Sequence, residues 1–169
     1  YMGSDGTVGV STGGEMADMV TPIATAFATA GQIYIAQLVG GQEQERLRIA
    51  IGTLFTMMMG MAIPLMIGCI IWNGQILRLL NCPEDAFTQA AGYLIITALG
   101  FPFIFLYNAI CGVLRGMGES KAPLVFIVIA AVINIFLDIL FVAVFHMEAA
   151  GTAIATVSAQ IGSCLAALC

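Results

Sequence analysis

One carboxyl group stands in an apolar segment where a charge is costly. Asp138 is the one charged residue of the run 122–145, and its neighbours are Leu137 and Ile139. An acid in such surroundings marks an ion or substrate path by default, and the loss of water favours its neutral, protonated form. Asn134 lies four residues earlier, which places its amide on the same face of a helix. We therefore predict a site that loads and releases H⁺ or Na⁺.

A hydroxyl group of the next apolar segment lies at a similar depth. Asp138 is seven residues before Phe145, which is roughly 10 Å along a helix. Thr156 is six residues after Ala150, which is roughly 9 Å. Because the connector is short, the two helices should be antiparallel neighbours, and we expect Asn134, Asp138 and Thr156 to converge. The alternative is that the acid only bonds a neighbouring helix and serves packing.

The composition indicates that these residues belong to a membrane protein. Of the 169 residues, 60% are apolar and 9% are charged, and the mean hydropathy is +1.02. Soluble domains carry ~25% charged residues, so the composition argues against a soluble enzyme, a disordered chain and a disulfide scaffold. The net charge is −5 with no basic patch, so we expect no nucleic acid partner. The expected surroundings are the lipid bilayer.

Long apolar stretches predict the fold class, an all-α, polytopic membrane helix bundle. A helix that crosses the bilayer needs ~20 predominantly apolar residues. Stretches that meet this requirement lie at 19–42, 49–77, 86–114, 122–147 (with Asp138 inside) and 149–169. We predict five transmembrane helices, the first of which can begin as early as Val8. Since the chain starts at Tyr1 and stops inside an apolar run, we expect it to be a piece of a longer protein.

The basic residues predict the orientation in the membrane. Four of the five Lys and Arg residues lie in the first and third connectors, 41–48 and 115–121, whereas the second holds only Arg78 and the fourth holds none. Cytoplasmic loops carry the excess of Lys and Arg. We therefore expect connectors 41–48 and 115–121 in the cytoplasm, in a multi-pass protein of the cell membrane.

The sequence offers little for catalysis or metal binding. The five cysteines form no CxxC pair and no metal-ligand spacing, so we predict no metal site and no organic cofactor. An intramembrane enzyme would need a second acid, base or nucleophile beside Asp138, but none lies three or four residues on, and His146 is eight residues away. We therefore predict that the protein is not an enzyme.

Four segments resemble the multidrug and toxic compound extrusion (MATE) family. The run GQIYIAQLVG at 31–40 is similar to the end of that family's second helix. The run LRGMGESKAP at 114–123 is similar to the cytoplasmic loop between its helices four and five. INIFLD at 133–138 resembles its fifth helix and GTAIATVSAQ at 151–160 its sixth, so the resemblance follows the whole chain in order.

The resemblance implies a secondary multidrug antiporter that exports xenobiotics, often organic cations, in exchange for H⁺ or Na⁺. Such proteins have twelve helices in two lobes around a central cavity. Residues 1–169 would be a single incomplete transmembrane domain, helices two to six of the N-terminal lobe, with the C-terminal lobe as its missing partner. The ion site of the family uses an Asn and an Asp of the fifth helix and a Thr of the sixth. By motif these are Asn134, Asp138 and Thr156, while the family's further acid on helix one has no counterpart here.

Two other functions stay open at this stage. A lipid-linked oligosaccharide flippase shares the wider fold, but it often lines its cavity with cationic residues, and this sequence places no Lys or Arg inside the apolar runs. A truncated, non-functional fragment is the second alternative. The residues that would line a drug cavity are open too, with Tyr93, Tyr107 and Asn108 as candidates because they are polar groups within a predicted helix.

Overall fold

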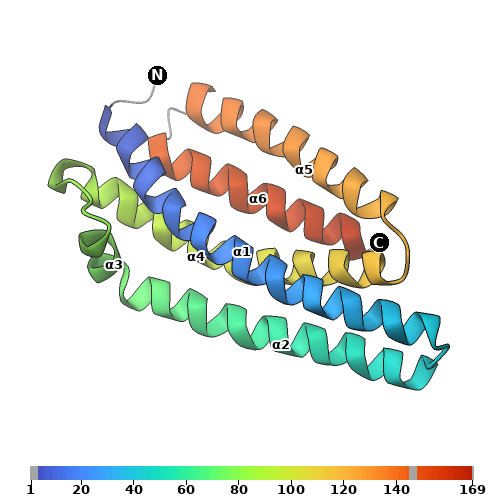
Figure 1. Ribbon diagram of the computed structural model, residues 1–169. Helices are drawn as coiled ribbons and strands as arrows, with labels where there is room; N and C mark the ends of the chain where they lie inside the picture. Colours follow the sequence, from blue (N-terminus) through green and yellow to red (C-terminus); the bar gives the residue numbers. More distant parts are fainter. Residues whose placement is uncertain (1–3, 145–147, 169) are drawn as a thin grey trace.

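The protein is a bundle of long helices (Figure 1). The structure is a computed structural model that describes residues 4–144 and 148–168, with the side chains of 14–15, 18–141, 151–165 and 167. Its elements are α1 (Ser4–Gly40), α2 (Gln44–Ile71), α3 (Asn73–Leu79), the 3₁₀ turn η1 (Glu84–Ala86), α4 (Phe87–Gly116), α5 (Lys121–Asp138), the π-helix η2 (Ile139–Val144) and α6 (Glu148–Leu168). Among these described residues there is no strand, as predicted.

Helix α4 forms the centre of the bundle. It packs against α1, α2, α3 and α6. Fully buried residues recur along it every three or four positions, at Leu94, Ala98, Phe101, Phe105 and Ala109. This spacing gives one continuous apolar stripe along a helix, and here the stripe builds the core with buried residues of α1 and α2.

Helix α5 lies at the edge of the bundle, against α6 (Figure 1). Pro123 is its one buried residue among the described side chains. Large apolar side chains cover the rest of its surface, including Leu124, Val128, Ile135 and Phe136, each more than half exposed. Exposing so much apolar surface of an 18-residue helix to water would be unfavourable, whereas lipid tails would bury it.

Four helices within the described residues are long and apolar enough to cross a bilayer. They are Asp18–Gly40, Gln44–Ile71, Glu84–Gly116 and Lys121–Phe141. These match the first four predicted spans. The fifth predicted span, 149–169, is occupied by α6, which has 21 residues and a length of roughly 30 Å. Several of the side chains of α6 lie outside the described residues.

The helices extend further into the connectors than the sequence analysis expected. Within the predicted loop 41–48, α2 already begins at Gln44. The reason is that Gln, Glu, Arg and Leu are good helix formers, so a helix continues through them although they are polar. The second predicted span, 49–77, is interrupted at Trp72, where α2 ends and the short helix α3 follows, and η1 lies at the end of the next connector; neither α3 nor η1 was predicted. The fourth connector, 146–150, lies partly outside the described residues.

The turn between α4 and α5 is built by Gly118 and Glu119. Gly118 has φ +90°, a conformation that costs glycine little. Its N–H donates to Arg115 O (3.1 Å), and the Glu119 N–H donates to Leu114 O (2.8 Å), which closes the end of α4 as a Schellman motif. The Glu119 carboxylate then accepts from the Lys121 N–H (3.0 Å) and so caps the start of α5.

Glycines let α4 approach α1 at backbone distance. A Cβ added to Gly112 would lie 2.8 Å from Ala28 O, and one added to Gly116 would lie 2.8 Å from Gln32 O. The offset of 84 residues is the same in both pairs, so α1 and α4 run parallel in a fixed register. Small residues spaced by four are a common means of close helix packing in membranes.

Candidate functional site

The helices that carry Asp138 and Thr156 are antiparallel neighbours, as the sequence predicted. Helices α5 and α6 pack against each other in opposite directions (Figure 1). Their register follows from Gly162, whose added Cβ would lie 3.7 Å from Ile133 Cδ1. Five residues further along α5 is Asp138, and five residues back along α6 is Val157, the neighbour of Thr156. Within the described residues, however, no hydrogen bond joins Asn134, Asp138 and Thr156.

Asp138 sits where the helix changes its geometry. It is the last residue of α5, and the π-helix η2 begins at Ile139. Short π segments within helices occur frequently at functional sites. One carboxylate oxygen of Asp138, Oδ1, is buried and has no hydrogen-bond partner among the described residues. Such a group is costly unless a ligand, an ion or a proton satisfies it.

Thr156 lines a cavity of about 370 Å³ between α1, α4 and α6. The polar residues around this cavity are Asp18, Thr21, Tyr93, Thr97, Thr156 and Gln160. The Thr156 hydroxyl donates to Thr152 O (2.9 Å), so its lone pairs are available to accept from a bound group. Asn134 and Asp138 are not among the lining residues, so the convergence predicted for the three side chains is only partly met.

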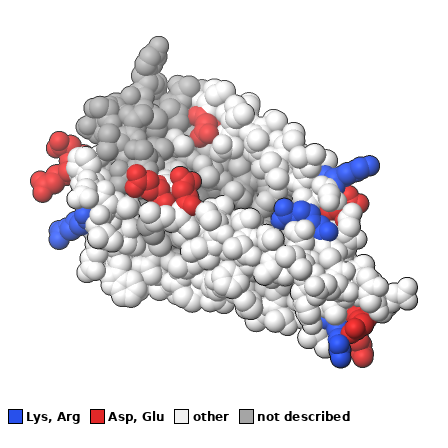
Figure 2. Space-filling model, viewed as in Figure 1, with Lys and Arg blue, Asp and Glu red and all other residues white. Residues whose placement is uncertain are grey.

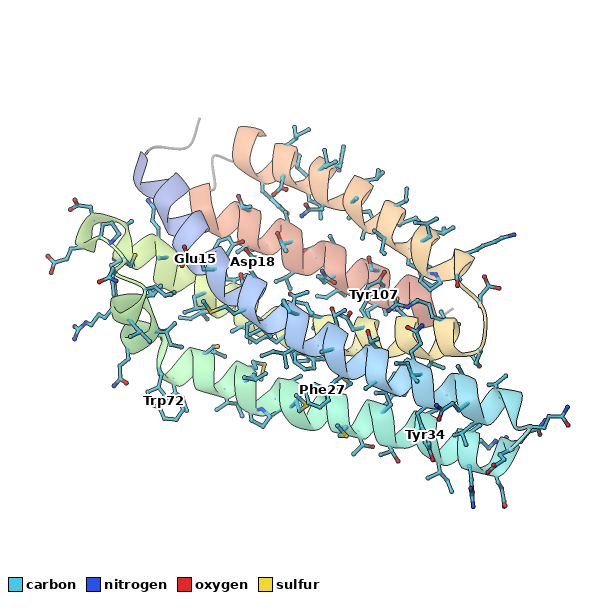
Figure 3. All side chains as sticks on the ribbon, viewed as in Figure 1. Glu15, Asp18, Phe27, Tyr34, Trp72 and Tyr107 are labelled. Carbon is cyan, nitrogen blue, oxygen red and sulfur yellow. The ribbon has the colours of Figure 1, made fainter. Side chains whose placement is uncertain are left out.

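Tyr93 lines the cavity from α4. This side chain is 7% exposed, and it borders the cavity together with Asp18. It comes from α4, one helix away from Asp138, whereas Asp18 comes from α1 (Figure 3).

Helix α6 meets α4 at Gly100. A Cβ added to Gly100 would lie 2.9 Å from Val157 Cγ2 of α6. Gly100 and Val157 both line the cavity that Asp18 borders from α1.

Sequence reasoning missed Asp18 and Thr97 as members of a site. Asp18 lies at the polar border of the first apolar stretch, so it looked like the end of a span. Thr97 is a common residue in membrane helices and gives no signal of its own. Of the candidate cavity residues, Tyr93 does line the cavity. Asn108 instead joins α4 to α1, since it accepts a hydrogen bond from the Thr25 hydroxyl (3.3 Å).

These features define a class of protein: an integral membrane bundle of long helices that holds acidic and hydroxyl side chains together between its apolar spans. The sequence of the chain matches the MatE family over residues 1–140. The chain belongs to this family, whose members are integral membrane transporters and not enzymes. This confirms the expectation that the protein is not an enzyme.

Curated relatives include two proteins of Bacillus subtilis (strain 168). The probable multidrug resistance protein YoeA is 31% identical over 169 residues, which cover 98% of this chain and 36% of that protein. The probable multidrug resistance protein YpnP is 47% identical over 85 residues, which cover 50% of this chain and 19% of that protein. The chain therefore spans about a third of the length of YoeA.

Solved structures of multidrug resistance MATE family transporters share the fold. An inward-facing conformation superposes with a TM-score of 0.93 at 18% identity, over 97% of this chain and 37% of that chain. An outward-facing conformation superposes with a TM-score of 0.91 at 19% identity, over 97% of this chain and 36% of that chain. The arrangement of α1 to α6 is thus compatible with both states of those transporters.

Proposed function

We propose that this chain forms helices two to six of the N-terminal lobe of a secondary active multidrug transporter. The complete protein would export xenobiotics, often organic cations, in exchange for H⁺ or Na⁺. The names of YoeA and YpnP support a role in multidrug resistance. The similar fit to inward-facing and outward-facing structures supports a lobe that moves as one body while its partner lobe moves against it.

The observation that carries the proposal is the unsatisfied carboxylate of Asp138. Its Oδ1 is buried without a hydrogen-bond partner among the described residues, at the depth of Thr156 and directly before the π-helix η2. Burying a charge without a partner is costly, and binding of H⁺ or Na⁺ removes that cost. Asp138 is therefore the coupling residue of this proposal, with Asn134 and Thr156 as the neighbouring amide and hydroxyl.

The mechanism requires a cation affinity that differs between two conformations. Loading of Asp138 would stabilise the conformation in which the carboxyl group is least hydrated, and release would favour the other. Each tenfold difference in cation affinity between the two states shifts their equilibrium by about 1.4 kcal/mol. This shift would drive the export of a bound drug.

The charge distribution favours a cationic substrate over a lipid-linked oligosaccharide. Asp18 lines the cavity beside Tyr93, and no Lys or Arg is among the residues that line it. Most of the basic side chains lie where α1 turns into α2 and where α4 turns into α5 (Figure 2). We assign this end of the bundle to the cytoplasmic side of the cell membrane, which puts turns 41–43 and 117–120 there.

The test is substrate transport by the full-length protein in proteoliposomes. Wild type, Asp138→Asn and Asp85→Asn are compared with ethidium as the organic cation, under an H⁺ gradient and under a Na⁺ gradient. We expect at least a tenfold loss of gradient-driven transport in Asp138→Asn, because the amide cannot load a cation. Asp85 is an exposed acid of η1 and serves as the matched control, which we expect to match wild type.

The two gradients identify the coupling ion. If transport depends on only one of the two gradients, the ion of that gradient is the coupling ion. Unchanged gradient-driven transport in Asp138→Asn would refute the role of this carboxyl group. Equal losses in Asp138→Asn and Asp85→Asn would show a general effect of negative charge and would refute it too.

A further inference from the structure

A polar pocket lies at the end of the bundle where α3 and η1 connect α2 to α4 (Figure 1). Its volume is about 650 Å³, within the range of pockets that hold small organic groups. The described residues that line it are Arg78, Asn81, Cys82, Glu84, Phe87 and Thr88. The turns 41–43 and 117–120 are at the opposite end of the bundle, so in the proposed orientation the pocket faces the outer side of the membrane.

Helix α3 holds one wall of this pocket in a fixed position. Its Leu77 is 0% exposed and packs in an apolar cluster with buried residues of α4. The helix ends as a Schellman motif, in which the Cys82 N–H donates to Leu77 O (3.0 Å) and the Asn81 N–H donates to Arg78 O (3.1 Å). Asn81 has the left-handed conformation of this motif, with φ +55°. The residues that follow α3 are therefore held against α4 by packing and by backbone hydrogen bonds.

The pocket carries one positive and one negative side chain. Arg78 borders it from the end of α3, and Glu84 borders it from η1. Within the described part of the chain no ion pair joins these two residues, whereas Arg46 and Glu43 do form one at the other end of α2. Asn81 adds an amide that can donate and accept hydrogen bonds. The pocket therefore suits a ligand that carries an anionic and a cationic group close together.

The surroundings of the pocket place it in the headgroup layer of the bilayer. The candidate spans Gln44–Ile71 and Glu84–Gly116 both terminate beside it. Trp72 and Leu79, at the two ends of α3, are 55% and 82% exposed, and Figure 3 shows the Trp72 side chain pointing away from the bundle. Tryptophan is enriched where hydrocarbon meets water. A ligand of this pocket therefore has polar partners within it and apolar side chains beside it.

We propose that this pocket binds the headgroup of an aminophospholipid, phosphatidylethanolamine, from the outer leaflet. Arg78 pairs with the phosphate, because a guanidinium matches the geometry of phosphate oxygens. Glu84 accepts hydrogen bonds from the primary ammonium, which has N–H donors that the quaternary ammonium of phosphatidylcholine lacks. The acyl chains lie against the exposed apolar surface of Trp72 and Leu79. The inference goes beyond the proposed function, since lipid binding does not depend on transport.

The test measures lipid binding to the purified full-length protein in detergent by native mass spectrometry. Phosphatidylethanolamine, phosphatidylcholine and phosphatidylglycerol with identical acyl chains are added in separate titrations. Ion pairs at an exposed site are weak, so we expect a moderate preference. Wild type should bind one phosphatidylethanolamine at least threefold more tightly than either of the other lipids.

Two variants separate the roles of the charged residues. Glu84→Gln should bind phosphatidylethanolamine and phosphatidylcholine equally, because the ammonium loses its partner. Arg78→Gln should bind both lipids at least threefold more weakly than wild type, because the phosphate loses its partner. Asp85→Asn and Arg48→Gln are the matched controls, since both residues are exposed and neither lines the pocket. We expect both controls to keep the preference of wild type.

The results that would overturn the inference are defined for each step. Equal binding of phosphatidylethanolamine and phosphatidylcholine by wild type, or a preference that persists in Glu84→Gln, would refute the proposed site. Tighter binding of phosphatidylglycerol would show a site for anionic lipids instead. Free phosphoethanolamine at the concentration of the lipid should displace none of it, and displacement would refute the assignment to a lipid. Arg78 and Glu84 are exposed, so their replacement leaves the core intact. Asp138→Asn should bind the lipid as wild type does, so a failure of the proposed function leaves this result unaffected.

Discussion

A methyl group at Gly112 would separate the two helices that hold the cavity together. The Cβ of Gly112→Ala would lie 2.8 Å from Ala28 O, a backbone atom of α1. That carbonyl is held in the hydrogen bonding of its helix, so it cannot rotate away. For the contact to reach the ordinary distance of about 3.4 Å, α4 and α1 must move apart by about 0.6 Å.

The expected cost follows from two opposing effects. Overpacking at a tight contact costs about 1–3 kcal/mol. Alanine is preferred over glycine inside a helix by about 1 kcal/mol, which offsets part of this. We expect a net loss of about 1 kcal/mol for Gly112→Ala. Adding Gly116→Ala, which meets Gln32 O at 2.8 Å, should raise the loss to about 2 kcal/mol, without strict additivity because both residues lie in one interface.

Thermal unfolding of the full-length protein measures this cost. Cys69, Cys111 and Cys164 are buried free thiols, so a thiol-reactive fluorophore reports their exposure on unfolding. Because the full-length relative is about three times as long as this chain, a loss of 1 kcal/mol should lower the Tm by about 1 °C. The control is Gly92→Ala, also in α4, where a Cβ has no atom within 4 Å. We expect its Tm to match or exceed that of wild type, because only the helix preference acts there.

The result that would refute the reasoning is a Tm of Gly112→Ala equal to or above that of Gly92→Ala. In that case α1 and α4 would not touch at backbone distance. The packing that brings Asp18 and Tyr93 around one cavity would then lose its support.

Two further changes test the turn and the core. Gly118→Ala should destabilise the protein by about 1 kcal/mol, because φ +90° is strained for alanine; the Tm checks this, and Gly118→Asn should recover part of the loss. Phe101→Ala should cost about 3–5 kcal/mol, because Phe101 is 0% exposed at the centre of α4. Phe136→Ala, at a residue 65% exposed on α5, should cost far less in the same unfolding assay. Similar losses for both phenylalanines would contradict the assignment of α4 as the central helix.

Much of the fold could be predicted because the local sequence determines which segments span the membrane. A run of about 20 apolar residues must become a helix in lipid, where backbone groups have no water to bond. The first four spans and the antiparallel pairing of α5 with α6 followed from this. Connector ends were less predictable, since polar residues such as Glu45 and Arg46 continue a helix as readily as they end it.

The candidate site was predicted only in part. Asp138 gave a strong signal because a charge inside an apolar run is rare. Its depth relative to Thr156 followed from counting residues at a fixed rise per residue. Whether side chains at one depth meet is a different question, because it depends on the rotation of each helix about its axis. Thr156 turns toward α1 and α4 and lines the cavity, whereas Asp138 is not among the residues that line it.

The sequence by itself therefore determined the environment, the helices and the depth of each polar residue, since these depend on local composition and on helix geometry. Only the tertiary structure brought Asp18, Tyr93, Thr97 and Thr156 around one cavity. These residues come from three helices, and their alignment is set by close contacts at Gly100, Gly112 and Gly116. The position of a glycine in the sequence does not identify the helix that packs against it. The alignment of these side chains is therefore known only from the packed helices.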